Sequence, residues 1–319
     1  MDREDGLGAG LFALPPIKAD ANKYTRGSLL IVAGSTRFPG AAVLAAKAAE
    51  RAGAGYVSLA VPASVASVAQ GHLLTVPVIA AGDTGGVFAA DALPGILSSL
   101  NHSDAILCGP GMTANESTAA FLGALFAEAK VPLVLDADAI NLLGWPLAGD
   151  GANGAVGAGL LWEKLPPDAV LTPHAGELAR LQAAVGGAPA GAKTSSVAEP
   201  GGTEPTEPTE LDELAKRLQA TIVAKGPETR VYPPKRAMQP FVYTDGTPAL
   251  AKAGTGDVLA GIIAALIAQG MQPFHAAQTG VLLHGRAGRL VEANSSRRSL
   301  IASDIIDALS HVFYEIEGI

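Results

Sequence analysis

The sequence predicts an α/β protein in which a mostly parallel central sheet carries helices on both faces. Three observations indicate this class. Short apolar runs alternate with helix-like segments along most of the 319 residues. Apolar residues make up 49% of the chain and charged residues 16%, which is enough apolar material for a large core. Glycines are abundant (38) and aromatic residues few (5%), as suits closely packed helices joined to strands by tight turns.

The first strand-turn-helix unit is expected near the N-terminus. Residues 28–33 (SLLIVA) form an apolar run, the Gly-rich turn 34–40 follows, and an alanine-rich helix extends from Ala41 to Ala52. Further strands are expected within residues 53–62, 104–112, 131–143, 168–181 and 221–234, the last containing a turn. Helices are expected to begin within 131–143 and 168–181, and two C-terminal helices at 258–270 and 273–292.

Residues 183–210 interrupt this alternation. The segment is rich in Gly, Pro, Thr, Ser and Ala and repeats the triplet TEP, with too few large apolar residues to build a core element. A flexible surface loop is the simplest interpretation, and a lid or a partner-binding loop is the alternative. Because sheet-like sequence continues on both sides, we expect residues 1–319 to form a single domain with an insertion at about 183–210.

Composition excludes several classes of function. The formal charge is 22 − 30 = −8, without a basic run, which argues against nucleic-acid binding but not against binding one small anion. Cys108 is the only cysteine, so no intrachain disulfide can form and a reducing compartment is favoured. The N-terminus lacks an apolar signal core, and the longest apolar run, around Val258–Ala268, is too short to span a bilayer. We expect a soluble, cytoplasmic protein without membrane or nucleic-acid partners.

The segment AGTGD (253–257) leads directly into that apolar run. Glycines at 254 and 256 permit unusual backbone conformations, and free N–H groups at a helix start attract anions such as nucleotide phosphates. Asp257 would lie at the edge of such a pocket, where it could accept a proton from a hydroxyl that attacks a phosphoryl group. A plain helix cap explains the same residues equally well.

The segment TPHAGE (172–177) follows a predicted strand. His174 could hydrogen-bond a substrate amide or a phosphate, and Glu177 could orient a magnesium-bound water. A solvated loop histidine and a helix-start glutamate are the alternative.

Two other segments also follow predicted strands. Asp136 and Asp138, in DADAINLL, fit either a phosphate and metal neighbourhood or N-capping of the next helix. Gly109 and Gly111, in the triplet GPG, allow a ligand to approach the backbone closely, or form a turn and nothing more.

The segment AKGPETR (224–230) is a third candidate for phosphate binding. Lys225 and Gly226 could meet a nucleotide, or form a β-turn with an exposed lysine. No G-x-x-x-x-G-K-[ST] motif is present, so this is not a Walker-type loop. The turn at 34–40 lacks the G-x-G-x-x-G spacing, so a dinucleotide-binding Rossmann fingerprint is not supported.

In the order of its motifs the chain resembles one family, the ADP/ATP-dependent NAD(P)H-hydrate dehydratases of the ribokinase-like superfamily. The matching segments are FPGAAVLAAKAAERAGAGYV, GPG, DADAINLL, TPHAGE, KG, LAKAGTGDVLAGIIAALIAQG and ASDII, across roughly residues 20–312. The resemblance implies a three-layer α/β/α sandwich and a hydro-lyase activity. These enzymes return the hydrated cofactors (S)-NADHX and (S)-NADPHX to NADH and NADPH. A nucleotide phosphorylates the ring hydroxyl, and phosphate then leaves.

The resemblance also implies roles for individual residues. Asp257 would be the base for the substrate hydroxyl, and Gly254, Thr255 and Gly256 would form the anion hole. Substrate contacts are implied for Ala41, Gly111, His174 and Asp257. Nucleotide contacts are implied for Lys225, Gly226, Pro227, Glu228, Thr229 and Gly256. Glu177 would act near Mg²⁺ through water, and ADP or ATP would be the co-substrate.

The chain departs from the family pattern at a few positions. Thr255 replaces the more usual serine, and Tyr243 and Asp245 stand where relatives often carry an asparagine-containing turn. We expect a homo-oligomer, with a tetramer favoured, that works with a separately encoded NAD(P)HX epimerase. Two alternatives stay open: a ribokinase-like kinase of a hydroxymethylpyrimidine or hydroxyethylthiazole, and a nucleotide-binding regulatory protein without catalysis.

Overall fold

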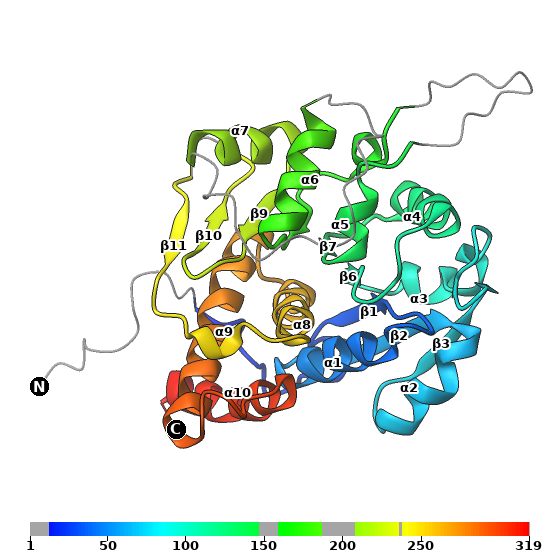
Figure 1. Cartoon of the computed structure of the whole chain (residues 1–319). Coiled ribbons are helices and arrows are strands. Elements are labelled where there is room, and N and C mark those ends of the chain that lie inside the picture. Colours follow the sequence, from blue (N-terminus) through cyan, green and yellow to red (C-terminus); the bar gives the residue numbers. More distant parts are fainter. Residues whose placement is uncertain (1–12, 147–158, 187–207, 236–237, 319) are drawn as a thin grey trace, which may run out of the picture.

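A nine-stranded sheet runs through the molecule in the order β11-β10-β9-β8-β7-β6-β1-β2-β3 (Figure 1). The computed structural model describes residues 13–146, 159–186, 208–235 and 238–318. Neighbouring strands are parallel from β3 to β9. Strand β10 pairs antiparallel with both of its neighbours, β9 and β11. The strands of this sheet are β1 (Ser28–Val32), β2 (Tyr56–Pro62), β3 (Val78–Ala81), β6 (Ala105–Cys108), β7 (Leu133–Leu135), β8 (Val170–Leu171), β9 (Thr221–Ala224), β10 (Thr229–Tyr232) and β11 (Phe241–Tyr243). A separate hairpin joins β4 (Asp83–Thr84) to β5 (Val87–Phe88).

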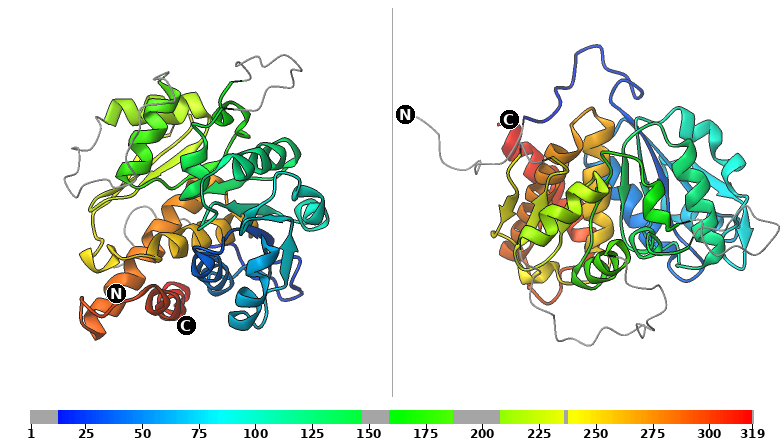
Figure 2. Two further views of the ribbon diagram at one scale, coloured as in Figure 1. Left: turned by 45° about the vertical axis from the view of Figure 1, so that its right-hand side comes forward. Right: turned by 90° about the horizontal axis from the view of Figure 1, so that it is seen from above.

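Helices cover both faces of the sheet, as the turned views in Figure 2 show. One face carries α1 (Pro39–Arg51), α2 (Ala66–His72), α8 (Thr255–Ala268), α9 (Pro273–Asn294) and α10 (Ala302–Glu317). The other carries α3 (Leu97–Asn101), α4 (Glu116–Glu128), α5 (Asp138–Leu142), α6 (Ala175–Val185) and α7 (Pro208–Leu218). Each layer closes its own apolar core against the sheet. This three-layer arrangement confirms the predicted fold class.

Helix α8 is buried along nearly its whole length, packed against α1, α9 and the sheet. Close approach to α1 depends on Gly261, because a Cβ atom there would lie 2.5 Å from the Ala45 carbonyl oxygen. The apolar run after Asp257 is therefore a central core helix. Among the described residues, no helix is both long enough and apolar enough to cross a bilayer.

The predicted insertion at 183–210 needs a correction at both ends. Helix α6 continues to Val185, and α7 begins at Pro208, so the ends of that range are helical. Helix α7 places Leu211, Leu214 and Leu218 against the core at a helical spacing. Residues 187–207 lie outside the described residues. The single-domain expectation stays a prediction, supported by one sheet that collects strands from Ser28 to Tyr243.

The sequence reasoning also left several elements unassigned. These include β3, β4, β5, β11, α2, α3, α4, α7 and the third C-terminal helix, α10.

Candidate active site

Functional side chains gather where β7, β8 and β9 end. These strands are parallel neighbours, so their carboxyl ends meet at one edge of the sheet. Asp136 follows β7, Thr172 and His174 follow β8, and Lys225 follows β9. A parallel bridge pairs His174 with Lys225, and the Lys225 N–H donates to the Pro173 carbonyl at 2.9 Å. Segments far apart in the sequence thus form one cluster.

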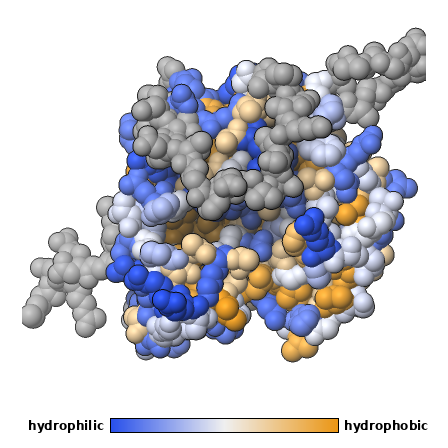
Figure 3. Space-filling model, viewed as in Figure 1, coloured by the Kyte–Doolittle hydropathy of each residue, from blue (hydrophilic) through white to orange (hydrophobic). Residues whose placement is uncertain are grey.

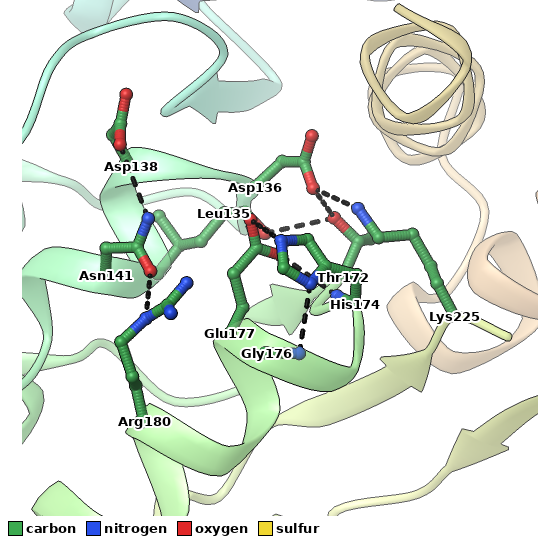
Figure 4. A network of polar contacts seen from close by, with 10 residues as sticks. All are labelled: Leu135, Asp136, Asp138, Asn141, Thr172, His174, Gly176, Glu177, Arg180 and Lys225. Atoms are coloured by element: carbon green, nitrogen blue, oxygen red, sulfur yellow. Dashed lines mark hydrogen bonds and ion pairs between the residues drawn. The ribbon is translucent and has the colours of Figure 1, made fainter. Parts of the chain in front are cut away.

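Asp136 is the centre of this cluster (Figure 4). Its side chain is 2% exposed, and Oδ1 accepts hydrogen bonds from Lys225 Nζ at 2.8 Å and Thr172 Oγ1 at 2.6 Å. Neither acid of DADAINLL caps the helix that follows. Ala137 is the N-cap of α5 and makes no side-chain cap, while Asp138 Oδ2 accepts from the Thr113 N–H at 2.9 Å. The N-capping alternative is therefore wrong for this pair.

The start of α8 has the free donors that an anion pocket needs. Gly254 is the N-cap, with φ of 90°, and makes no side-chain cap. The first intrahelical bond runs from Val258 N to Gly254 O at 3.2 Å, so the N–H groups of Gly256 and Asp257 precede the helical ladder. Asp257 lies in the first turn and is not the cap residue. The helix-cap alternative thus does not describe the role of Asp257.

Thr255 ties the start of α8 to the preceding turn through its hydroxyl. Its hydroxyl donates toward the carbonyls of Leu250 at 2.7 Å and Lys252 at 2.8 Å. These contacts tie the preceding turn, which contains the 3₁₀ segment η4 (Pro248–Leu250), to the helix start. A serine would keep the same hydroxyl.

Gly256 brings the helix start against the buried ion pair. A Cβ atom at Gly256 would lie 3.3 Å from Lys225 Nζ and 3.9 Å from Asp136 Oδ2. The free N–H groups of α8 and the Lys225 ammonium therefore face one small space. That combination of donors suits a phosphoryl group.

Asp257 has a strongly altered acidity. Burial, first, and the neighbouring Asp136 carboxylate raise the pKa of Asp257 to about 7, against the opposing effect of Lys225. Glu177 and Asp138 add smaller increases. A carboxyl group with a pKa near neutrality suits a general base that works near neutral pH.

His174 and Glu177 cap the start of α6 together. Nδ1 of His174 accepts from the Gly176 N–H at 3.0 Å, and Glu177 Oε2 accepts from the His174 N–H at 2.9 Å. The other ring nitrogen, Nε2, lies 3.1 Å from Glu177 Oε1. Because Nδ1 is an acceptor, the proton of a neutral imidazole is on Nε2, directed at Glu177. The His174 side chain is still 54% exposed at the mouth of the site.

The family resemblance implies a magnesium ion near Glu177. Within the described ranges, no group of three or more His, Cys, Asp or Glu side chains is arranged to hold a metal by itself. Mg²⁺ commonly uses one or two carboxylates, with phosphate oxygens and waters completing the shell. Both oxygens of Glu177 already contact His174, so its predicted action through water stays a prediction.

Ala41 and Gly111 lie against each other at the start of α1. Gly111 has φ of +64°, and a Cβ atom there would lie 2.6 Å from the Phe38 carbonyl oxygen and 3.0 Å from Ala41 Cβ. Helix α1 connects this cradle to α8, because a Cβ atom at Gly254 would lie 2.7 Å from Leu44 Cδ1. Only glycine permits this close approach in the left-handed backbone region.

A cavity of about 670 Å³ opens beside Gly256. Its lining includes His174, Lys225, Gly226, Pro227, Thr229, Tyr243, Leu250, Thr255, Gly256, Leu259, Val281 and His284. The space-filling view shows hydrophobic residues around a hollow on this face of the molecule (Figure 3). A mostly apolar cavity with a cationic, donor-rich end fits a nucleoside attached to phosphates.

Of the predicted nucleotide contacts, Glu228 alone is absent from this lining. Its carboxylate accepts from Arg230 Nε at 2.6 Å.

The turn before α8 also closes the cavity. Tyr243 is buried against Gly285, and its hydroxyl donates to the Asp245 carbonyl at 2.9 Å.

The sequence predicts helix α9, at 273–292, but not that this helix lines the cavity. Val281 and His284 lie three residues apart on α9 and line the cavity, and burial lowers the pKa of His284 to about 4. The spacing of apolar residues in VLLHG was the available signal. His284 is therefore a neutral imidazole throughout the ordinary pH range.

The chain matches a known protein family over most of its length. The profile of the family described as NAD(P)H-hydrate dehydratase matches residues 29–311. The chain belongs to this family. An ADP-dependent (S)-NAD(P)H-hydrate dehydratase of Xanthomonas campestris pv. campestris is 33% identical over 304 residues, covering 93% of this chain and 91% of the relative. A bifunctional NAD(P)H-hydrate repair enzyme of Salinibacter ruber is 37% identical over 307 residues.

A solved structure of a dehydratase also resembles this chain. The ADP/ATP-dependent NAD(P)H-hydrate dehydratase of Bacillus subtilis, co-crystallised with ATP/Mg²⁺, has a TM-score of 0.71 and 26% identity, covering 95% of this chain and 94% of that one. The matches to the bifunctional relatives from Salinibacter ruber and Moorella thermoacetica each cover 95% of this chain. The chain spans only about half the length of these relatives, 51% and 52%. A hydroxyethylthiazole kinase from Pyrococcus horikoshii, at TM-score 0.55 and 16% identity, shares the fold alone.

Proposed function

We propose that the protein dehydrates (S)-NADHX and (S)-NADPHX to NADH and NADPH in a nucleotide-dependent reaction. The observation that carries this proposal is the position of the Gly254–Asp257 segment. Gly256 opens onto the nucleotide-sized cavity, and Gly254 packs against α1, whose residue Ala41 meets Gly111. Family membership supports the reaction, since relatives are named for it.

The first step is phosphoryl transfer. Asp257 takes the proton of the ring hydroxyl, and the hydroxyl oxygen bonds to the terminal phosphorus as the P–O bond to the nucleotide breaks. With ADP as donor, AMP leaves. Lys225 Nζ and the free N–H groups of Gly256 and Asp257 stabilise the developing charge, as preorganised donors do.

The second step is elimination of the new phosphate. The lone pair of the ring nitrogen forms a C=N bond as the C–O bond breaks, and phosphate leaves with the electron pair of that bond. Loss of a proton from the neighbouring ring carbon to solvent then restores the dihydronicotinamide. Ala41, Gly111 and His174 would hold the hydrated ring against Asp257. The exposed His174 side chain, with its orientation fixed by Glu177, is suited to a polar contact with the substrate.

Magnesium is part of this proposal. Bound with the nucleotide, Mg²⁺ would neutralise phosphate charge, with Glu177 reached through water. The ATP/Mg²⁺ complex of the Bacillus subtilis relative supports the same ion here. ADP is the favoured donor, because the Xanthomonas relative, of which the match covers 91%, is named ADP-dependent.

The test mixes the purified protein with NADHX or NADPHX, ADP or ATP, and Mg²⁺. Return of absorbance at 340 nm is expected with at least one donor and substrate pair. No return in any pair, together with phosphorylation of hydroxymethylpyrimidine or hydroxyethylthiazole, would replace the dehydratase with a vitamin-precursor kinase. Inactivity in both assays would favour a non-catalytic nucleotide-binding protein.

Three broader features are also proposed. A cytoplasmic location is supported by the single, buried cysteine. A homo-oligomer, with a tetramer favoured by the family resemblance, is tested by light scattering of the purified protein. Cooperation with an NAD(P)HX epimerase is supported by the bifunctional repair enzymes among the relatives, and conversion of the R epimer only after an epimerase is added tests it.

A further inference from the structure

The roles assigned above leave the Asp136 carboxylate without a function. It is among the most buried charged groups of the described chain, and it holds Lys225 across the ends of two different strands. A buried ion pair is costly to assemble and is weak evidence for stability alone. Asp136 Oδ2 lies 3.9 Å from the Cβ position of Gly256, so the carboxylate is close to the anion pocket at the start of α8.

Asp136 determines where the Lys225 ammonium lies. The backbone of Lys225 is fixed by its hydrogen bond to Pro173, but a lysine side chain is flexible beyond that point. Asp136 Oδ1 supplies the ion-pair contact at 2.8 Å, and Thr172 holds the same oxygen at 2.6 Å. An ammonium has three donors, so one bond to Asp136 leaves others for phosphoryl oxygens beside Gly256.

The pair also acts on Asp257 with opposite signs. Asp136 raises the pKa of Asp257 and Lys225 lowers it, while Glu177 and Asp138 raise it by smaller amounts. Helix α9 contributes His284, which lines the cavity beside Gly256 and which burial keeps neutral. Removing one member of the pair therefore leaves the other acting on the base without compensation.

We propose that Asp136 is a positioning residue for the reaction: it holds the Lys225 ammonium at the anion pocket beside Gly256, and the ion pair sets the charge around Asp257. The inference rests on the proposed role of Asp257 as base. Asp136 does not contact the substrate in this proposal. It acts through Lys225 and Asp257.

Two substitutions with opposite expected effects test the proposal. Asp136→Asn should move the acid limb of the kcat/KM pH profile to lower pH by about one unit, because a negative neighbour is lost. Lys225→Met should move the limb to higher pH by a similar amount, because a positive neighbour is lost. Asp136→Asn should also raise the KM for the nucleotide about tenfold. A merely structural role would lower activity without opposite displacements.

Asp138→Asn is the matched control, since it removes a nearby carboxylate that binds Thr113 and leaves Lys225 paired. It should displace the limb in the same direction as Asp136→Asn but less, with a smaller change in the nucleotide KM. If Asp136→Asn fails to fold, the double variant Asp136→Asn/Lys225→Met is compared with Lys225→Met. Adding Asp136→Asn must then move the limb downward.

A readout without turnover separates this proposal from the proposed function. The carboxyl ¹³C signal of Asp257, assigned with Asp257→Asn, is titrated in each ligand-free variant. Opposite displacements of that titration support the proposal even if NADHX is never converted, in which case the dehydratase assignment alone fails. Displacements in the same direction, or none, in both the titration and the pH profile overturn it.

Discussion

At the scale of single residues, the buried carboxyl group of Asp257 links the proposed catalysis to folding stability. The same surroundings that prepare its carboxyl group to take a proton make its charged form unfavourable in the folded protein. Its folded pKa, about 7, lies above the ordinary 3.8, so its contribution to stability is full below about pH 4 and is lost as the pH rises through 7. Ionisation of Asp257, which prepares it to act as a base, therefore also lowers the free energy of unfolding.

Asp257→Asn should accordingly stabilise the protein at alkaline pH. We expect the variant to exceed the wild type at pH 8 by about 1–3 kcal/mol in the free energy of unfolding, less than the full shift represents because the side chain is partly exposed. Denaturant unfolding at pH 8 and pH 5 checks this. A gain at pH 5 as large as that at pH 8 would contradict the assigned pKa.

At the scale of elements, close packing of α8 on α1 sets where Asp257 lies. The packing surface is made by small residues, and Gly261 is the tightest point on α8, 2.5 Å from the Ala45 carbonyl if a Cβ were present. Sequence patterns predicted α8 as an apolar helix. They could not show that Gly261 faces α1, because a helix buried on all sides has no polar face to orient it.

Gly261→Ala should therefore destabilise the fold. Overpacking at this contact is expected to cost about 1–3 kcal/mol, and displacement of α8 should also lower turnover. Gly71→Ala in α2 is the matched control, since nothing lies within 4 Å of its Cβ position. That control should be neutral or stabilising by about 0.5–1 kcal/mol, as expected for glycine in a helix. Equal losses in both variants would show that α8 packing is not special.

At the scale of the whole molecule, strand order brings the motifs together. Asp136, His174 and Lys225 were each ambiguous in sequence because each follows a strand with a turn. Their meeting depends on parallel pairing of β7, β8 and β9, which places all three at one edge. The alternation of elements predicted such a sheet, but not the Asp136–Lys225 ion pair. That contact joins residues 89 positions apart, and no local pattern encodes it.

Labelling of Cys108 can measure whether the central sheet stays folded. It lies fully buried on the internal strand β6, and burial raises the pKa of its thiol. A thiol reagent at pH 8 should label it at a rate that follows global unfolding in denaturant, because the thiolate is the reactive form. Rapid labelling of the native protein, with circular dichroism unchanged, would mean that β6 opens locally.

The central claim is that the Gly254–Asp257 segment is the catalytic centre of a dehydratase. The most direct measurement compares wild type and Asp257→Asn in one assay at pH 8, with NADHX, ADP or ATP, and Mg²⁺, alongside calorimetric binding of the nucleotide. We predict that the wild type restores absorbance at 340 nm, while Asp257→Asn binds the nucleotide with similar affinity and shows no turnover. Near-normal turnover by Asp257→Asn would contradict the account.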